Sequence, residues 1–225
     1  MKVLIACEES QTITKAMRQR NIDAYSCDIQ DCSGGREDWH IKGDALKEAY
    51  SGKYEMMIAH PPCTYLATAG APNLYMKDGS RNEERFKKRA AALQFVRDLM
   101  NAPIKRIAIE NPIGAIATHI RPADCIVHPY HFGDQAQKTT CWWLKNLKPL
   151  QPTDIVDKGA FIEWISKKGV KNRVPAWYGS LFLQGKTQKE ISKIRSRFFP
   201  GMAAAIANQW GDQMLNDNFE QLELF

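Results

Sequence analysis

The chain has 225 residues, of which 44% are hydrophobic and 25% are charged, so one domain with an insert can bury a full core without help from disulfides. No segment approaches about 18 consecutive apolar residues, and the apolar N-terminal run ends at two acids, so we expect neither a membrane span nor a signal sequence. The six cysteines show no paired framework, which favours free thiols and a cytoplasmic protein.

The opening stretch of the chain predicts a βαβ unit. Residues 2–7 form a short apolar run, a helical pattern follows and ends near Asn21, and residues 23–28 form a second strand. Strand, helix and strand in so short a stretch imply parallel strands joined by a right-handed crossover. Cys27, Cys32 and His40 lie around the end of this unit. Their spacing matches no common zinc pattern and a fourth ligand is missing, so we expect no metal site.

Two further strands end in proline-containing turns that carry reactive side chains. Residues 54–59 form a nearly continuous apolar run, typical of a parallel strand that helices cover on both faces. This run ends at His60-Pro61-Pro62-Cys63, and the buried strand 105–109 ends at Glu110-Asn111-Pro112. Ligands of open α/β sheets bind at the carboxyl ends of the strands, so we expect Cys63 and Glu110 to face one crevice.

The other elements of the domain follow in order. Residues 82–101 repeat apolar side chains at helical spacing with charged residues between them, which predicts an amphipathic helix. A late strand is expected at 142–144, and the pattern then becomes irregular, with several prolines and glycines. A helix at 202–214 closes the domain.

Positive charge is concentrated in residues 158–197, which carry ten Lys or Arg against two Glu and hold +8 of formal charge within a chain of net charge +6. Trp164, Trp177 and Tyr178 are interleaved with these cations. Such a segment is typical of a surface that contacts phosphates. A solvated basic face without a partner is the alternative.

Cys63 and Glu110 each have a structural and a chemical interpretation. A cysteine after two prolines is held by a rigid backbone, and its thiolate is a strong carbon nucleophile. A lone cysteine of this kind can instead be a buried structural thiol. A lone acid at a strand end can be a helix cap or an ion-pair partner. A nucleophile and an acid that converge on one site form a functional constellation, which favours the chemical interpretation.

The motifs His60-Pro61-Pro62-Cys63 and Ile109-Glu110-Asn111-Pro112 resemble, in order and separation, the two catalytic motifs of the cytosine-5 DNA methyltransferases, and among them small phage-borne members. Other segments resemble this family in the same order: residues 3–11 its first strand and cofactor loop, Asp28 its ribose acid, and Gly43-Asp44-Ala45 its adenine motif. Phe132-Gly133 with Lys138, and residues 201–207, resemble its later motifs.

The chain departs from the family at three places. Ala6-Cys7-Glu8-Glu9-Ser10-Gln11 lacks the Phe and the glycines of the first motif. Lys138 and Thr140 stand where the family has two arginines, and Arg and Lys are not equivalent in bidentate recognition. The target-recognition region is short, so sequence selectivity could be modest or absent.

The resemblance implies an α/β, Rossmann-like S-adenosylmethionine-dependent methyltransferase fold with a mostly parallel sheet flanked by helices. Residues 1–148 and 194–225 would form the catalytic domain, and 149–193 a short basic recognition insert. The implied activity is methyl transfer from S-adenosylmethionine to carbon 5 of cytosine in DNA, within a bacterial or phage-infected cell. Methylation of a free cytosine nucleotide, and an inert DNA-binding module on the same fold, remain alternatives.

The site residues follow from the same resemblance. Glu110, protonated because burial raises its pKa, would donate to N3 of the cytosine while Cys63 adds to carbon 6. The predicted residues are, for catalysis, Cys63, Glu110, Pro62, Asn111 and Lys138; for the cofactor, Ala6, Cys7, Glu8, Glu9, Asp28, Ile29, Asp44, Ala45, His60, Pro61 and Ala203; and for DNA, Lys167, Lys168, Lys171 and Arg173.

Overall fold

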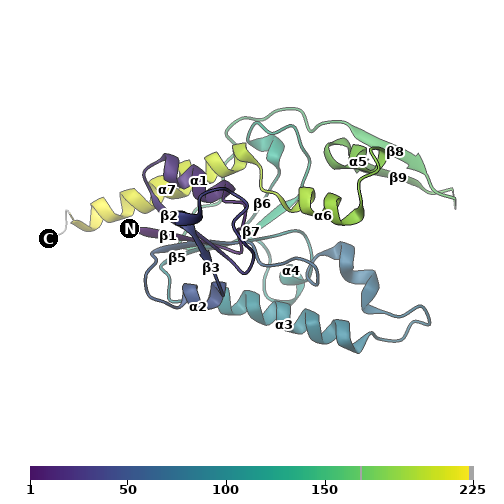
Figure 1. Cartoon of the computed structure of the whole chain (residues 1–225), viewed down its shortest axis with the longest axis horizontal. Helices are drawn as coiled ribbons and strands as arrows, with labels where there is room; N and C mark the ends of the chain where they lie inside the picture. The colour runs from purple at the N-terminus through teal and green to yellow at the C-terminus, as the bar shows by residue number, and fades with distance from the viewer. Residues whose placement is uncertain (168, 223–225) are drawn as a thin grey trace.

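A seven-stranded sheet in the order β3-β2-β1-β4-β5-β7-β6 forms the centre of the molecule (Figure 1). The structure is a computed structural model and describes residues 1–167 and 169–222. The strands of the sheet are β1 (Lys2–Ala6), β2 (Asp23–Asp28), β3 (His40–Lys42), β4 (Met56–Ala59), β5 (Arg106–Asn111), β6 (Cys125–Val127) and β7 (Thr140–Lys145).

Strand directions confirm the predicted fold class. The pairs β1–β2, β1–β4, β2–β3 and β4–β5 are all parallel. β7 lies between β5 and β6 and is antiparallel to both. This order with one antiparallel strand is that of the Rossmann-like fold of S-adenosylmethionine-dependent methyltransferases. The carboxyl ends of β1, β2, β4 and β5 therefore lie along one edge of the sheet.

Helices cover both faces of the sheet because alternate strand residues point to opposite sides. Val3 and Ile5 of β1 pack in one buried cluster with residues of α1 and α7, whereas Leu4 and Ala6 pack in a second cluster with residues of α2, α3 and α4. Figure 1 shows these two layers. The helices are α1 (Thr12–Gln19), α2 (Ala45–Ala49), α3 (Glu83–Met100), α4 (Ala115–His119) and α7 (Pro200–Leu222), with 3-10 turns η1 (Glu37–Trp39), η2 (Thr68–Leu74) and η3 (Pro129–His131).

The segment predicted to be irregular contains regular structure. It forms an antiparallel hairpin of β8 (Phe161–Ile165) and β9 (Lys171–Pro175), followed by α5 (Ala176–Leu183) and α6 (Gln188–Ser196). α6 begins with a capping box in which the Thr187 side chain accepts from the Glu190 backbone and the Glu190 side chain accepts from the Thr187 backbone. The predicted boundary of the insert at residue 193 falls within this helix.

None of the helices that the structure describes has both the length and the apolar character needed to cross a bilayer.

Candidate active site

The ends of β4 and β5 bring the two predicted reactive residues to the same edge of the sheet. Ala59, the last residue of β4, is paired with Ile109 in the parallel register, so His60, which follows β4, lies beside Glu110, the penultimate residue of β5. The His60 Nδ1–H donates to Glu110 Oε2 at 3.2 Å, and both side chains are largely buried, 14% and 13% exposed. Cys63 lies three residues beyond His60 and is exposed.

A buried amide fixes the two strand ends relative to each other. Asn111 is 1% exposed, and its Nδ2 donates to the carbonyl oxygen of Pro61 at 2.7 Å. The backbone of Ala115 donates to Leu66 at 2.7 Å in the loop that follows Cys63. At Gly114 an added Cβ would lie 1.9 Å from that same Leu66 oxygen, so the two loops are in direct contact. The relative position of Cys63 and Glu110 is therefore set by contacts within the protein.

The surroundings of Cys63 favour the neutral thiol. Although Cys63 is exposed, the adjoining protein removes enough water to raise the pKa of its thiol, and the negative charge of Glu110 raises it further. The positive charges of Lys138 and Arg195 act in the opposite direction and only partly offset this rise. A lowered pKa is one route to a nucleophilic thiolate. The surroundings of Cys63 do not lower the pKa of its thiol.

The expectation that Glu110 is protonated is wrong for the arrangement seen here. Burial does raise the pKa of the Glu110 carboxyl, as expected. The hydrogen bond from His60 and the positive charge of Lys138 outweigh burial and leave that pKa below its ordinary value. The physical reason is that a histidine and a lysine from other segments of the chain converge on this carboxylate, and the strand-end position of Glu110 alone does not reveal them.

Lys138 is another predicted catalytic residue near this edge. It precedes β7, its Nζ donates to the carbonyl oxygen of Arg197 at 3.3 Å, and its charge acts on both Cys63 and Glu110. Pro61 is buried and Pro62 is exposed. Of the residues predicted for catalysis, Cys63, Glu110 and Lys138 interact electrostatically, and Asn111 joins the two strand ends.

Several of the predicted cofactor residues surround the adjoining ends of β1 and β2. Burial, together with the nearby charges of Asp28 and Asp44, raises the pKa of the Cys7 thiol to about 12, which indicates how closely these groups are gathered. Asp28 Oδ1 accepts from the Gln30 backbone at 2.8 Å, and Ile29 is 78% exposed beside it. Asp44 caps α2 through the Leu46 backbone, and the next residue, Ala45, is buried. Two carboxylates and an exposed aliphatic side chain thus border one surface.

Other predicted cofactor residues have structural partners. Glu8 is 4% exposed, and its carboxylate accepts from the Ile13 backbone at 2.7 Å and from the Thr14 hydroxyl at 2.6 Å, so it caps α1 from inside the protein. The Glu9 carbonyl accepts from the Ser33 backbone. Ala203 is 1% exposed and packs in the core cluster of α1 and α7.

Sequence reasoning missed three residues that shape the site. Gln11 is fully buried and holds the loop after β2, because its amide donates to the Arg36 carbonyl at 2.7 Å and accepts from the Arg36 backbone at 3.1 Å. Phe198 packs against His60 with ring centroids 5.2 Å apart. Arg195, at the end of α6, acts on Cys63. Arg195 carried a signal as one of the cations of the basic segment, and Gln11 lies in the segment 3–11 that resembles the family's cofactor loop.

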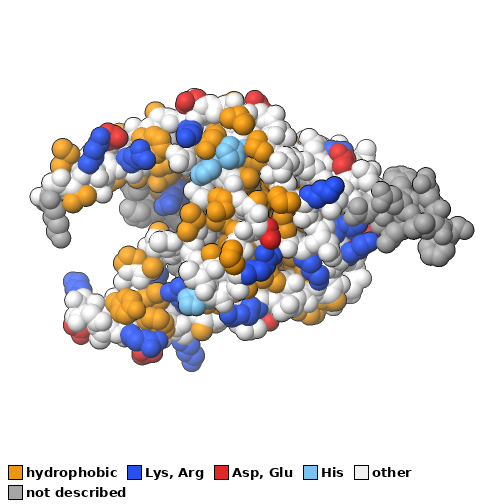
Figure 2. Space-filling model, turned by 180° about the vertical axis from the view of Figure 1, so that it is seen from behind, with side chains coloured by type: hydrophobic (Ala, Val, Ile, Leu, Met, Phe, Trp, Pro, Cys, Tyr) orange, Lys and Arg blue, Asp and Glu red, His pale blue; other side chains and the backbone are white. Residues whose placement is uncertain are grey.

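Three of the four residues predicted to bind DNA lie in the β8–β9 hairpin. Lys167, Lys171 and Arg173 are exposed, whereas Lys168 lies outside the described residues. Lys171 pairs with Glu163 at 2.7 Å, and the Arg173 guanidinium lies 4.9 Å from the centre of the Phe161 ring. The hairpin and the loop before α3 project from the same end of the molecule (Figure 1), and Figure 2 shows a hollow between these two arms.

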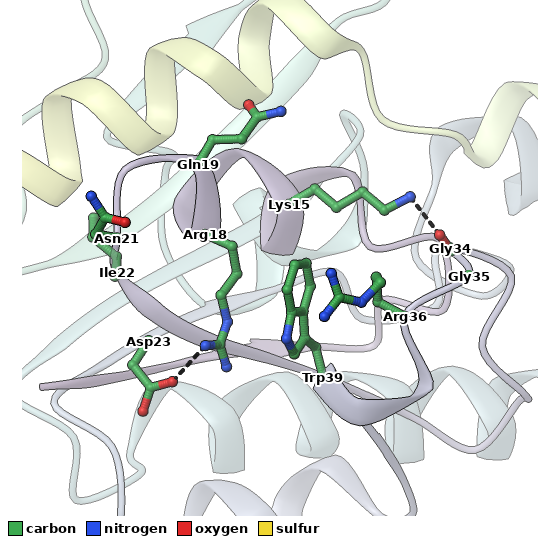
Figure 3. Close-up of a pocket in the computed structure, with 10 residues that line it drawn as sticks. All are labelled: Lys15, Arg18, Gln19, Asn21, Ile22, Asp23, Gly34, Gly35, Arg36 and Trp39. Carbon is green, nitrogen blue, oxygen red and sulfur yellow. Dashed lines mark hydrogen bonds and ion pairs between the residues drawn. The ribbon is translucent and has the colours of Figure 1, made fainter.

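A separate cavity of about 750 Å³ lies between α1 and the loop after β2 (Figure 3). None of its lining residues was predicted to act in catalysis, and its cations already have partners. Lys15 donates to the Gly34 carbonyl, Arg18 pairs with Asp23 at 2.8 Å, and Arg36 lies 3.6 Å from the Trp39 ring centre. This cavity is thus held open by internal contacts.

No protein-family model matches the chain, and no curated protein sequence matches it significantly. Among solved structures, it is similar to the methyltransferase EhMeth of Entamoeba histolytica, with 16% identity and a TM-score of 0.46 over 72% of this chain and 58% of that one. It is also similar to an rRNA methylase of Escherichia coli, with 14% identity and a TM-score of 0.35 over 64% of this chain and 55% of that one. A mutant of Spodoptera frugiperda DNMT2 is similar with 11% identity and a TM-score of 0.37, over 71% of this chain and 56% of that one. The chain therefore spans less than two thirds of the length of each of these proteins.

Proposed function

We propose that this protein transfers a methyl group from S-adenosylmethionine to carbon 5 of a cytosine in DNA, with Cys63 as the nucleophile and Glu110 as the group that activates the ring. One observation carries the proposal. Glu110 lies at the carboxyl end of β5 and Cys63 lies in the turn after the adjacent parallel strand β4, and the hydrogen bond from Asn111 to Pro61 joins these two segments.

The residues at the ends of β1 and β2 suit a nucleoside cofactor. Carboxylates accept hydrogen bonds from ribose hydroxyls and from an adenine amino group, the roles proposed for Asp28 and Asp44. The exposed side chain of Ile29 offers an apolar surface for the base. Once bound, S-adenosylmethionine would supply an electrophilic methyl group. Because the Glu8 carboxylate is turned into the protein, the loop after β1 would contact a ligand mainly through its backbone.

Carbon 5 of cytosine is a poor nucleophile until another atom adds to carbon 6. The Cys63 sulfur would form a bond to carbon 6 and shift the electrons of the 5,6 double bond, so that carbon 5 becomes enamine-like. Negative charge then builds toward N3, where the Glu110 carboxyl would donate a hydrogen bond or a proton. Such a contact is typically worth a few kcal/mol in the transition state. An acid suits N3 of cytosine because that nitrogen is an acceptor.

The reaction requires a thiolate and a carboxylic acid, the reverse of the states that their surroundings favour. One proton that leaves Cys63 and one that reaches Glu110 would produce both required forms with no change in net charge. A base that lies between them would also exclude water from both groups. Loss of water raises the pKa of a carboxyl, which helps Glu110 retain the proton.

Placing the substrate within DNA is supported by the hollow beside the site and by the exposed cations of the β8–β9 hairpin. A base inside a duplex cannot reach a thiol at a sheet edge, so the cytosine would have to be flipped out of the stack. The cations would bind phosphates and make the affinity dependent on salt.

The test is incubation with methyl-labelled S-adenosylmethionine and either duplex DNA, single-stranded DNA or free cytosine nucleotides, followed by nucleoside analysis. We expect 5-methylcytosine from a DNA substrate. We also expect a covalent complex with DNA that contains 5-fluorocytosine, through the peptide bearing Cys63. Cys63→Ser should abolish both products, whereas the matched variant Cys125→Ser on the edge strand β6 should retain them.

If the methyl label appeared only in free nucleotides, the substrate would be the free cytosine nucleotide and not DNA. Methylation by Cys63→Ser at the unmodified rate would refute the covalent mechanism. DNA binding without detectable cofactor binding by calorimetry would identify an inert DNA-binding module.

A further inference from the structure

His60 is the immediate neighbour of the Glu110 carboxyl and is held in place by two aromatic rings. Its ring centroid lies 5.2 Å from that of Phe198 and 6.1 Å from that of Trp142. The Nδ1–H donates to Glu110 at 3.2 Å. The other nitrogen, Nε2, is buried, and no partner for it is found among residues 1–167 and 169–222. Within the described chain, the polar contact of this ring is therefore directed at Glu110.

We propose that His60 is a positioning residue that stores the proton which Glu110 presents to the cytosine, so that the two side chains act as one proton-carrying pair. This inference rests on the proposed function, because it assigns the source of a proton that methyl transfer requires. It goes beyond the role in cofactor binding that the sequence suggested for His60.

The transfer is balanced without any additional reactant. The imidazolium Nδ1–H bond breaks and an O–H bond forms at Glu110 Oε2, which leaves a neutral imidazole and a carboxylic acid. Glu110 then donates its proton to N3, while the Cys63 thiol loses its proton to solvent and its sulfur bonds to carbon 6. Histidine suits this role because imidazole is the side chain that gains and loses a proton near neutral pH. When carbon 5 loses its proton to solvent and Cys63 departs as the thiolate, N3 gives its proton back to Glu110, and Glu110 returns it to His60 Nδ1.

Other charged groups face the pair from the surrounding elements. Glu8, in the loop after β1, interacts with His60, and Lys138, before β7, interacts with Glu110. Cys141 of β7 and Cys63 both lie within the field of Glu110. Arg195 of α6 acts on Cys63. Glu8 thus places an acid beside His60, and Lys138 places a cation beside Glu110.

The test compares the pH profile of methyl transfer in wild type, His60→Gln and His119→Gln. Glutamine keeps an N–H that can donate to Glu110 but cannot carry an exchangeable charge. We expect kcat of His60→Gln at neutral pH to fall by roughly 10- to 100-fold, within the range of general acid–base catalysis. The alkaline limb of its profile should move to lower pH. His119→Gln, on α4, should behave as wild type. An equal loss at every pH, or no loss, would overturn the proposal.

A second measurement does not need an active enzyme. Carbon-13 NMR of the Glu110 carboxyl follows its titration directly in wild type and in His60→Gln. Because His60 lowers the pKa of Glu110, the midpoint should rise in His60→Gln, and an unchanged midpoint would refute the proton-carrying pair. If wild type transfers no methyl group while this midpoint moves, the proposed function fails and the coupling of His60 to Glu110 stands.

Discussion

Cys63 and Glu110 influence each other because each lies in the electrostatic field of the other. Glu110 raises the pKa of the Cys63 thiol, while Lys138 lowers the pKa of both groups. Reactivity of the thiol toward a simple alkylating agent therefore reports on its neighbours without any assumption about the substrate, since only the thiolate reacts.

We predict that Glu110→Gln increases the rate of Cys63 alkylation by iodoacetamide between pH 7 and 8. Removal of the negative charge lowers the thiol pKa, so more thiolate exists at a given pH. Lys138→Gln should have the opposite effect, because it removes a charge that stabilises the thiolate. Peptide mass spectrometry gives the rate for Cys63, and Cys32 in the same samples is the internal control. Equal rates in the three proteins would contradict the electrostatic description.

Single residues also show where sequence reasoning succeeds and where it fails. The proximity of Cys63 and Glu110 was predictable because Glu110 lies at the end of β5, Cys63 lies four residues beyond the end of β4, and neighbouring parallel strands end at one edge. The lowered pKa of Glu110 could not be predicted in this way, because the residues that lower it come from other segments of the chain. One of them, Lys138, is twenty-eight residues away in sequence. The loop after β1 has no glycine, and Cys7 and Gln11 adopt φ near +60° there without one.

Short elements connect the site to the sheet. The turn after Cys63 and the turn after Glu110 form an isolated antiparallel bridge between Ala67 and Gly114, and Thr68 donates to the Ile113 carbonyl at 3.0 Å. A glycine is required at this crossing because any Cβ would meet the Leu66 oxygen. The two halves of the site thus depend on one close backbone approach.

We predict that Gly114→Ala destabilises the protein by about 2 kcal/mol, in the range of other steric strain in packed interiors. Either turn must move, so methyl transfer should fall more than DNA binding does. Urea unfolding and single-turnover assays measure the two effects. Gly43→Ala is the matched control for stability, since a Cβ there meets nothing within 4 Å, and its free energy of unfolding should stay within about 0.5 kcal/mol of wild type. An unchanged stability of Gly114→Ala would show that the turns are less tightly coupled than their contacts imply.

Prediction of elements succeeded where the pattern was long or continuously apolar. The long helix was predicted at 82–101 and occupies Glu83–Met100, and the second strand, Asp23–Asp28, agrees at both ends. β3, β6, α2 and α4 were missed, because three to five residues show no measurable periodicity. The β8–β9 hairpin was missed because its strands are largely exposed on both faces and carry few alternating apolar positions.

At the scale of the whole molecule, the first and the last helix of the chain pack against each other. α7 packs beside α1 on one face of the sheet, and Trp210 of α7 meets Trp142 of β7 with ring centroids 5.0 Å apart. The basic segment lies between β7 and α7 in the chain, so it is an insertion between two elements of the core. Whether it forms a separate recognition unit, as the sequence predicts for residues 149–193, can be tested by removing part of it.

The β8–β9 hairpin packs on α5, and its two ends meet, which allows the chain to be rejoined after the hairpin is removed. The Ala176 backbone donates to the Ala160 carbonyl at 2.8 Å, so residues 161–175 can be replaced by a Gly-Gly turn. We predict that this protein folds and binds S-adenosylmethionine like wild type but binds DNA more weakly. The slope of log affinity against log salt should decrease by about 1 for each phosphate that the protein no longer binds.

A full-length variant separates the charge of the hairpin from its shape. Lys167, Lys171 and Arg173 changed together to Gln keep the strands, and we expect most of the decrease in affinity and in salt dependence to appear in this variant too, measured by fluorescence anisotropy at several salt concentrations. Lys105→Gln, at the opposite end of β5, is the matched control and should bind as wild type. If the excised protein bound DNA with an unchanged salt slope, the hairpin would not be the phosphate-binding arm. The phosphates would then have to be bound by the facing arm, the loop before α3, where Lys77 and Arg81 are exposed.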